Sequence, residues 1–383
     1  MNNKILAVAT AVILAGGTIS TAEAVGTRVA SGTYGGFAWQ AANRIIGVNP
    51  TATLNNPPNN PGGDPIYYAA MPQYSGVAAL IMDYGNGQRF ICSGSLLPDR
   101  RSILTAAHCV SKGTSDRPLE TTAYFFDGDP NERVPFNPLS TAVLVSDYFV
   151  NSAYTGEVID QNDIAVLRLT ENAPDFASSY DLAPEDDLTG LGVNAAGYGG
   201  RSTVGGNLGV DSRTGWLRQG DNRYDFRLGD PDFGGFWDGF FGSAPVDFSY
   251  LTDFDNGLDA NDTSCLIAAA LGLGGSKYCN TGEGVMEVST AGGDSGGPQF
   301  VNGRISSVTS YGLTFGTDFG DIFCVPNNCL NSSFGEFNGF VPVYLHREFI
   351  RSSLFVPSVP EPGSLALLGL GLMGLGLSRR RKA

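Results

Sequence analysis

The sequence predicts an all-β fold, and three observations carry the prediction. The 383-residue chain is 42% hydrophobic and only 16% charged, which is typical of a globular protein. It contains 52 glycines and 21 prolines, which favour turns over long helices. Short apolar or alternating runs, separated by Gly, Asp and Asn clusters, lie at 76–82, 123–126, 142–145, 164–169 and 305–310. Such a series of short strands is typical of antiparallel barrels or sandwiches.

Three further segments interrupt this pattern. Residues 49–65 are rich in Asn and Pro without apolar periodicity and are expected to form a loop. Residues 201–262 are rich in Gly, Asp and aromatic side chains, so we expect a long surface insertion or a small subdomain there. Residues 344–352 have helical character, with Leu345, Phe349 and Ile350 on one side.

The start of the chain predicts export. A short basic region at 1–4 precedes an apolar run at 5–14, and small residues flank Glu23 at the expected cleavage site. We interpret 1–24 as a signal peptide. The mature protein then reaches a compartment where its six cysteines can form disulfides, although their spacing alone does not choose a pairing.

The end of the chain, 357–383, predicts sorting after export. Pro360-Glu361-Pro362 precedes an apolar, Gly-rich run at 365–377, and a basic cluster closes the chain. The run is short and Gly-rich for a membrane span. The arrangement resembles the PEP-CTERM sorting tail of Gram-negative bacteria, which implies an exosortase-type enzyme as partner. It also implies membrane contact only through the tail before processing, and a secreted or cell-surface location; the alternative is an ordinary C-terminal anchor.

Charge and composition limit the partners. The formal net charge of −15 argues against nucleic acid, because phosphate binding needs a basic face. The acidic segment 253–259 lacks the ligand spacing and closing Glu of an EF-hand, so we expect a solvated acidic turn, with calcium binding as the alternative. No cofactor and no metal are predicted.

Three segments carry residues suited to nucleophilic catalysis: 104–109 with His108, 162–169 with Asp163, and 293–298 with Ser295. A serine hydroxyl needs a base to remove its proton, and imidazole suits that role near neutral pH. A buried carboxylate fixes the imidazole tautomer, and glycines beside the serine let amides converge on an oxyanion. The second histidine, His346, has no serine motif beside it and is expected to be structural.

In this order the three segments resemble the trypsin and chymotrypsin family over roughly 45–354, within a domain that we assign to 45–356. The resemblance implies two antiparallel six-stranded barrels of chymotrypsin type, a C-terminal helix and a long insertion. It implies that His108 is the base, Asp163 its orienting acid and Ser295 the nucleophile. The amides of Gly293 and Ser295 would form the oxyanion hole, and 196–199 resembles the segment between the barrels. The implied activity is that of a serine endopeptidase acting on proteins or peptides.

The same resemblance suggests substrate-binding residues. Ser289 corresponds to the floor of the primary pocket, Ser310-Tyr311-Gly312 to the strand that pairs with substrate backbone, and Gly312 and Gly339 to open pocket walls. A neutral floor predicts cleavage after apolar or aromatic residues rather than Lys or Arg. Glu287 is the alternative acid that could reach the pocket.

An activation step and three disulfides are also implied. Arg44-Ile45 resembles a zymogen junction, with 25–44 as a short propeptide and Asp294 as the partner of the new amino terminus. An ordinary strand start is the alternative. Cys92 and Cys109 match a family bridge, as do Cys265 and Cys279, which leaves Cys324 and Cys329 to pair locally. Ala291 stands where the family often has a cysteine, so one pocket disulfide is absent.

Two other functions compete with a peptidase. A protease-fold surface or matrix-binding protein without activity would not need the triad residues or the oxyanion glycines. A serine esterase or lipase usually has a Gly-x-Ser-x-Gly elbow and the order Ser, Asp, His, and neither feature is present.

Overall fold

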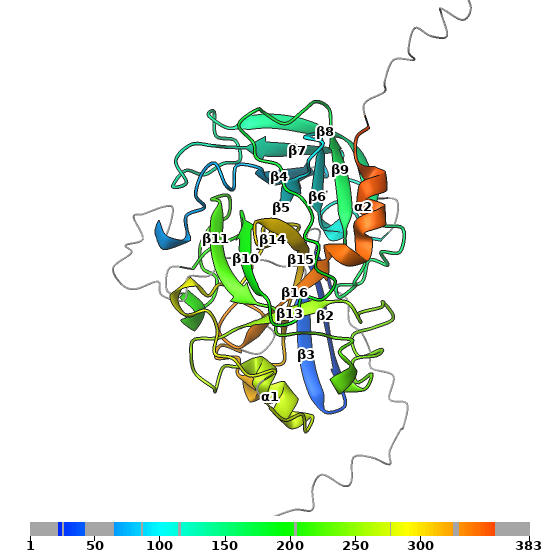
Figure 1. The fold of residues 1–383 in the computed structure, drawn as a ribbon, viewed down its shortest axis with the longest axis vertical. Helices are drawn as coiled ribbons and strands as arrows, with labels where there is room; N and C mark the ends of the chain where they lie inside the picture. Colours follow the sequence, from blue (N-terminus) through cyan, green and yellow to red (C-terminus); the bar gives the residue numbers. More distant parts are fainter. Residues whose placement is uncertain are drawn as a thin grey trace, which may run out of the picture.

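The computed structural model describes residues 22–24, 27–42 and 65–356, apart from 86, 114–115, 203–204, 276 and 325–328. The expected Arg44-Ile45 junction, the tail at 357–383 and nearly all of the expected signal peptide lie outside these residues. Figure 1 shows two strand-rich halves, one above the other, with a helix near the end of the chain against the upper half.

The upper half is a closed barrel of six antiparallel strands in the order β4-β5-β6-β9-β8-β7. Its strands are β4 (Val77–Asp83), β5 (Arg89–Leu96), β6 (Ser102–Thr105), β7 (Glu120–Phe125), β8 (Thr141–Val150) and β9 (Ala165–Leu169). Strand β6 is buried along its whole length, and in β7 alternate side chains enter the core, as a half-exposed strand requires. The predicted runs at 76–82, 123–126, 142–145 and 164–169 all fall on these strands.

The lower half is a ten-stranded antiparallel sheet that curls without closing. Its members are β1 (Ala22–Ala24), β2 (Thr27–Tyr34), β3 (Phe37–Ala42), β10 (Gly192–Gly197), β11 (Arg218–Arg223), β12 (Phe226–Arg227), β13 (Tyr250–Phe254), β14 (Pro298–Val301), β15 (Arg304–Thr314) and β16 (Glu336–Pro342). The all-β fold of chymotrypsin type is confirmed, but the second barrel stays open, because in the described part of the chain no ladder joins β11 to β13. The Asn222 side chain crosses this opening and donates to the carbonyl oxygens of Asp253 and Val288.

The segment 201–262 is not one insertion. Strand β11 lies in the sheet beside β10, and β13 pairs with β16 at five positions. The part between β12 and β13 is the extra loop, and its aromatic residues Phe233, Trp237, Phe240 and Phe241 are buried. They form a second apolar core together with residues of β3 and β15.

Residues 27–42, within the expected propeptide, form a hairpin of β2 and β3. Strands β2 and β3 pair along six positions, from Val29 opposite Ala42 to Tyr34 opposite Phe37. Strand β3 then pairs with β15, and so extends the lower sheet.

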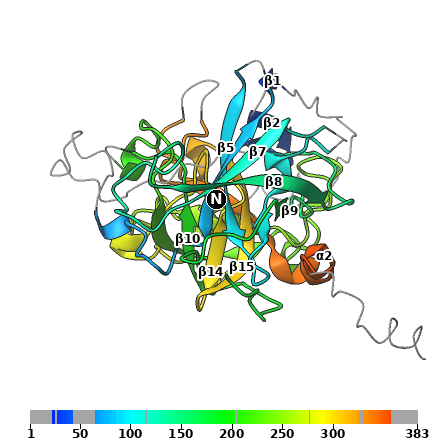
Figure 2. The ribbon, with the colours of Figure 1, turned by 90° about the horizontal axis from the view of Figure 1, so that it is seen from above.

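Two helices and three disulfides complete the described structure. Helix α1 (Thr263–Ala270) is capped at its amino end by Asp262, whose side chain accepts from the Cys265 amide. Helix α2 (Arg347–Ser353) follows a short 3-10 turn. Figure 2 shows α2 at the side of the strands of the upper barrel. The disulfides join Cys92 to Cys109, Cys265 to Cys279 and Cys324 to Cys329, as expected. Within the residues described, no helix combines the length and apolarity needed to cross a bilayer.

Candidate active site

The segment around His108 is fixed where the upper barrel meets the lower sheet. Strand β6 ends at Thr105, whose hydroxyl donates to the Ser93 carbonyl at 2.8 Å. The next turn, Ala107–Cys109, is tied to β5 by the Cys92–Cys109 disulfide. The His108 backbone amide donates to Asp163 Oδ1 at 2.7 Å, so both backbone and ring are held.

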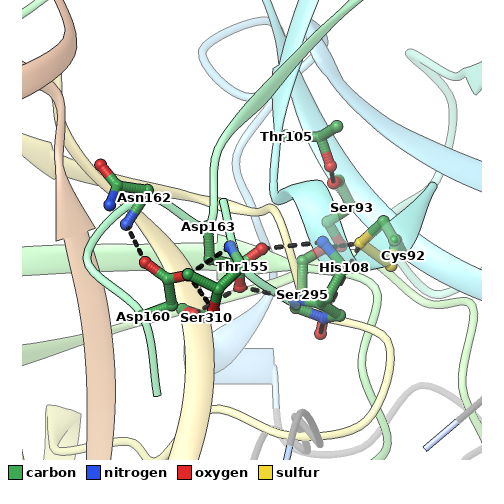
Figure 3. A network of polar contacts seen from close by, with 11 residues as sticks. Cys92, Ser93, Thr105, His108, Thr155, Asp160, Asn162, Asp163, Ser295 and Ser310 are labelled. Atoms are coloured by element: carbon green, nitrogen blue, oxygen red, sulfur yellow. Dashed lines mark hydrogen bonds and ion pairs between the residues drawn. A yellow bond between two sulfur atoms is a disulfide. The ribbon is translucent and has the colours of Figure 1, made fainter. Parts of the chain in front are cut away.

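Three side chains form one continuous relay (Figure 3). His108 Nδ1 lies 2.7 Å from Asp163 Oδ2, and His108 Nε2 lies 2.7 Å from Ser295 Oγ. An ionised carboxylate only accepts, so Nδ1 carries the proton and Nε2 is left to accept from the serine hydroxyl. The three residues, predicted from separate sequence segments, are therefore brought together at hydrogen-bond distances.

Asp163 is fully buried just before β9. Its two oxygens accept from the amide and the ring of His108 and from the Ser310 hydroxyl, the last at 2.5 Å. Three donors compensate the loss of water around the carboxylate. Ser310, expected on the strand that binds substrate, thus also contacts the triad (Figure 3).

The loop before Asp163 is built on Asp160 and His346. Asp160 accepts from the amide and hydroxyl of Thr155 and from the Asn162 amide. His346 Nε2 lies 2.8 Å from the Gln161 carbonyl, and burial lowers the pKa of this histidine. His346 therefore packs against the loop that presents Asp163, apart from the relay itself.

The backbone around Ser295 requires glycine. Gly296 has φ +78°, and a Cβ there would lie 1.9 Å from Thr105 Oγ1. Gly293 has φ +113°, which side chains other than glycine rarely adopt. Within the described part of the chain, the amides of Gly293 and Ser295 donate to no acceptor. Two adjacent free amides beside a nucleophile are what an oxyanion site needs.

Asp294 points away from the relay into the protein. Its carboxylate accepts from the amides of Gly199 and Ala291, and a Cβ at Gly197 or Gly199 would lie within 2.2 Å of it. No lysine or arginine of the described residues pairs with it, and burial raises its pKa to about 7. The sequence 196–199 therefore wraps a buried acid that has no cation partner.

The region of the expected pocket floor is polar and neutral. Ser289 Oγ donates to Asn338 Oδ1 at 2.8 Å, and Thr290 donates to the same oxygen through its amide and its hydroxyl. Sequence reasoning missed Asn338, which lies in a strand next to Gly339 and carries no motif. Glu287 instead accepts from the Glu283 amide, and burial raises its pKa.

Gly339 does not leave an open wall as expected. A Cβ there would lie 2.2 Å from the Tyr311 ring, so this glycine makes room for that ring. Tyr311 is fully buried, and its hydroxyl lies 2.7 Å from Ser249 Oγ. A Cβ at Gly312 would make only ordinary contact, with Leu330 at 3.4 Å.

The acidic segment 253–259 is only partly solvated, contrary to expectation. Asp253 and Asp255 are buried, and burial raises the pKa of Asp255 to about 7. Two groups in the described residues have metal-like spacing, Cys92 with His108 and Cys109, and Asp262 with Cys265 and Cys279. Their cysteines are joined in disulfides and offer no thiolate, so neither group suits a metal.

Two regions of the chain match known family models. Residues 70–218 match the family model described as Trypsin. This match identifies a trypsin-like domain over 70–218, a range that holds His108 and Asp163. Residues 358–382 match the PEP-CTERM protein-sorting motif. The search of curated proteins found no match. A solved structure titled HL collagenase aligns over 76% of this chain and 99% of its own, with 17% identity and a TM-score of 0.46.

Proposed function

We propose that this trypsin-family protein is a secreted serine endopeptidase that works through an acyl-enzyme intermediate. The observation that carries the proposal is the relay Ser295–His108–Asp163, with both of its links at 2.7 Å. Binding alone requires no such relay, whereas activation of a serine hydroxyl does.

Acylation begins when Ser295 Oγ attacks the carbonyl carbon of the scissile peptide bond. His108 Nε2 takes the hydroxyl proton, and Asp163 stabilises the imidazolium that forms. The developing oxyanion accepts from the amides of Gly293 and Ser295. His108 then gives the proton to the leaving nitrogen, so the C–N bond breaks and an ester to Ser295 remains.

Deacylation repeats these steps with water. His108 removes a proton from a water molecule as its oxygen attacks the ester, and then returns a proton to Ser295 Oγ. The products are a new carboxyl end and a free serine. No metal or cofactor takes part in these steps.

The proposed preference is for apolar or aromatic residues before the cut. Ser289 and Asn338 at the expected floor are neutral, and Glu287 accepts from the Glu283 amide rather than from Ser289. A buried lysine or arginine of the substrate without such a partner carries a large desolvation cost.

Activation after Arg44 remains part of the proposal. The junction lies outside the described residues, but its expected partner Asp294 is buried with only amide donors. A new ammonium group at Ile45 would supply the missing cation and stabilise the charged carboxylate next to the Gly293 amide. Amino-terminal sequencing of the active form should read Ile45 first, and a fully active form that begins at Val25 would contradict this step.

Location follows from the two ends of the chain. The PEP-CTERM motif at 358–382 supports export and sorting to the surface of a Gram-negative bacterium by an exosortase-type enzyme. The expected signal peptide at 1–24 and the three disulfides fit an oxidising compartment.

Casein or a peptide library with purified protein tests the function. Wild-type protein should cleave, and Ser295→Ala should lose nearly all cleavage, because the oxyanion site alone leaves little catalysis. His346→Ala changes a buried histidine outside the relay, so it is the matched control and should still cleave the substrate. Equal cleavage by Ser295→Ala would support the alternative of a protease-fold binding protein with a contaminating activity.

A further inference from the structure

Strand β15 leads away from the relay, and beyond Ser310 its edge is paired with another strand of the same chain. Its residue Ser310 bonds to Asp163, and four residues later the strand ends at Thr314. Along this stretch one edge pairs with β16 and the other with β3 (Figure 1). An exposed strand edge beside a catalytic serine is a site where an extended peptide can add by backbone hydrogen bonds.

The direction of β3 matches that of a peptide entering the site. Gly312 pairs with Ala42, Leu313 with Ala41 and Thr314 with Gln40, in antiparallel register. The carboxyl end of β3 therefore points along β15 toward Ser310 and the relay. Ala41 and Ala42 are fully buried in this position, so the edge is covered.

Aromatic side chains anchor the hairpin beside this edge. Phe37 and Trp39 lie two residues apart in β3 and therefore on the same face. Trp39 meets Phe241 edge-on at 5.1 Å between ring centroids, and Phe37 stacks on Phe319 at 4.9 Å. Trp237, Phe240 and Phe315 complete the cluster, and Trp237, Phe240 and Phe241 come from the loop between β12 and β13.

Trp39 has an unpaired polar group in its buried position. Its indole N–H is buried and finds no acceptor among the described residues, and neither does that of Trp237. A buried donor without a partner costs free energy. Release of the hairpin would let water accept from the Trp39 indole N–H, so this unpaired donor favours release.

We propose that the edge Gly312–Thr314 and the adjacent aromatic cluster form a binding site for extended peptides carrying a large aromatic residue, and that the chain's own β2–β3 hairpin occupies it. The inference rests on the proposed peptidase function. An extended substrate and β3 then compete for one edge, while a reagent that needs only Ser295 does not compete. The cluster would select an aromatic side chain three residues before the one that pairs with Gly312, in the place that Trp39 takes.

Two active-site probes on the full chain separate these cases. A small alkyl fluorophosphonate needs only the activated serine. An eight-residue peptide with a phosphonate at its carboxyl end, and a tryptophan three residues before the one that would lie opposite Gly312, also needs the edge of β15 and the aromatic cluster. Ala41→Pro disrupts a ladder of β3, because proline has no N–H. Trp39→Ala removes the anchor and leaves the backbone intact, and Thr33→Ala, at the exposed end of the hairpin, is the matched control.

The ratio of peptide labelling rate to small-probe labelling rate is the readout. We expect it to rise by about tenfold or more in Ala41→Pro and Trp39→Ala, and to stay unchanged in Thr33→Ala, since each tenfold equals roughly 1.4 kcal/mol. If Ala41→Pro fails to fold, it loses labelling by the small probe, and Trp39→Ala then decides. An unchanged ratio in variants that the small probe labels normally would overturn the inference alone. No labelling by the small probe of any form that keeps Ser295, whether uncut or cut after Arg44, would overturn the proposed function and the inference with it.

Discussion

The upper barrel has six strands and the lower sheet has ten, and the two halves also differ in how they are held together. The upper barrel closes through continuous ladders around six strands with an apolar interior. The lower sheet is open between β11 and β13, and polar groups such as the Asn222 amide bridge the opening. The closed half supplies His108 and Asp163, and the open half supplies Ser295, Ser310 and the expected pocket. His108 and Asp163 thus lie in the closed half with an apolar interior, while Ser295 and the expected pocket lie in the open half that polar groups bridge.

The largest effect is expected from a change at Asp163, which contacts His108 of the upper half and Ser310 of the lower half. Asp163→Asn should lower kcat on the order of 10⁴-fold, because an amide can present its NH₂ group to His108 and hold the wrong tautomer. Burial and the donors from His108 and Ser310 should keep the side chain in place. Steady-state kinetics on a peptide ester provides the measurement, with thermal unfolding to verify the fold. A loss below about tenfold would mean that His108 is oriented by something other than Asp163.

A truncation in the closed barrel should destabilise the protein strongly. Leu104 on β6 is fully buried, so Leu104→Ala should lower the free energy of unfolding by about 2–5 kcal/mol. Leu119 is 80% exposed, so Leu119→Ala is the matched control and should change the free energy of unfolding by less than about 0.5 kcal/mol. Urea unfolding measures both variants. Equal effects would contradict a tightly packed upper barrel.

The open half should carry a pH dependence of stability. Burial raises the pKa of Asp255 to about 7 and that of Asp225 and Asp262 to about 6. The folded protein then keeps protons that the unfolded chain has released, so the free energy of unfolding falls as pH rises from about 4 to 7. Asp255→Asn should become more stable relative to wild type over this range, by about 1 kcal/mol or more.

The exposed Asp259→Asn serves as the control for this pH effect and should follow wild type. Urea unfolding at a series of pH values makes the comparison. If wild type and Asp255→Asn keep a constant difference from pH 4 to 8, Asp255 is ionised in the folded protein and the account of its burial is wrong.

Ser310→Ala should affect catalysis less than Asp163→Asn does. It removes one of the three donors to Asp163 and leaves the two from His108. A hydrogen bond to a charged group is worth about 1.5–3 kcal/mol, so kcat should fall by roughly 10- to 100-fold. Ser306→Ala, on the same strand but away from Asp163, is the control. An unchanged kcat in Ser310→Ala would limit Ser310 to substrate binding.

The two halves also differ in how far the sequence predicts them. In the upper barrel, apolar or alternating runs mark most strands, and the buried β6 and β9 carry the motifs of His108 and Asp163. In the lower sheet, β11 has the sequence Arg-Gln-Gly-Asp-Asn-Arg, which shows no apolar period. This strand is held by backbone pairing with β10 and with the loop from 283 to 288. Its place depends on contacts distant in sequence, and such contacts leave no local pattern.

The candidate site divides in the same way. The triad could be predicted because its chemistry restricts residue types and the glycines around Ser295 are required by the backbone. Asn338 could not, since an asparagine inside a strand has no signal until β16 brings it to Ser289. The hairpin before residue 43 was expected only as a short propeptide, because its aromatic residues acquire meaning only opposite the cluster around Trp237.

Mass spectrometry of the protein after reaction with a fluorophosphonate tests the central claim most directly. The account predicts one adduct per chain, on the peptide that contains Ser295, and its loss in both Ser295→Ala and His108→Ala. His346→Ala should still be labelled. An adduct on a different serine, or equal labelling of Ser295 without His108, would contradict the assignment of this relay as the catalytic centre.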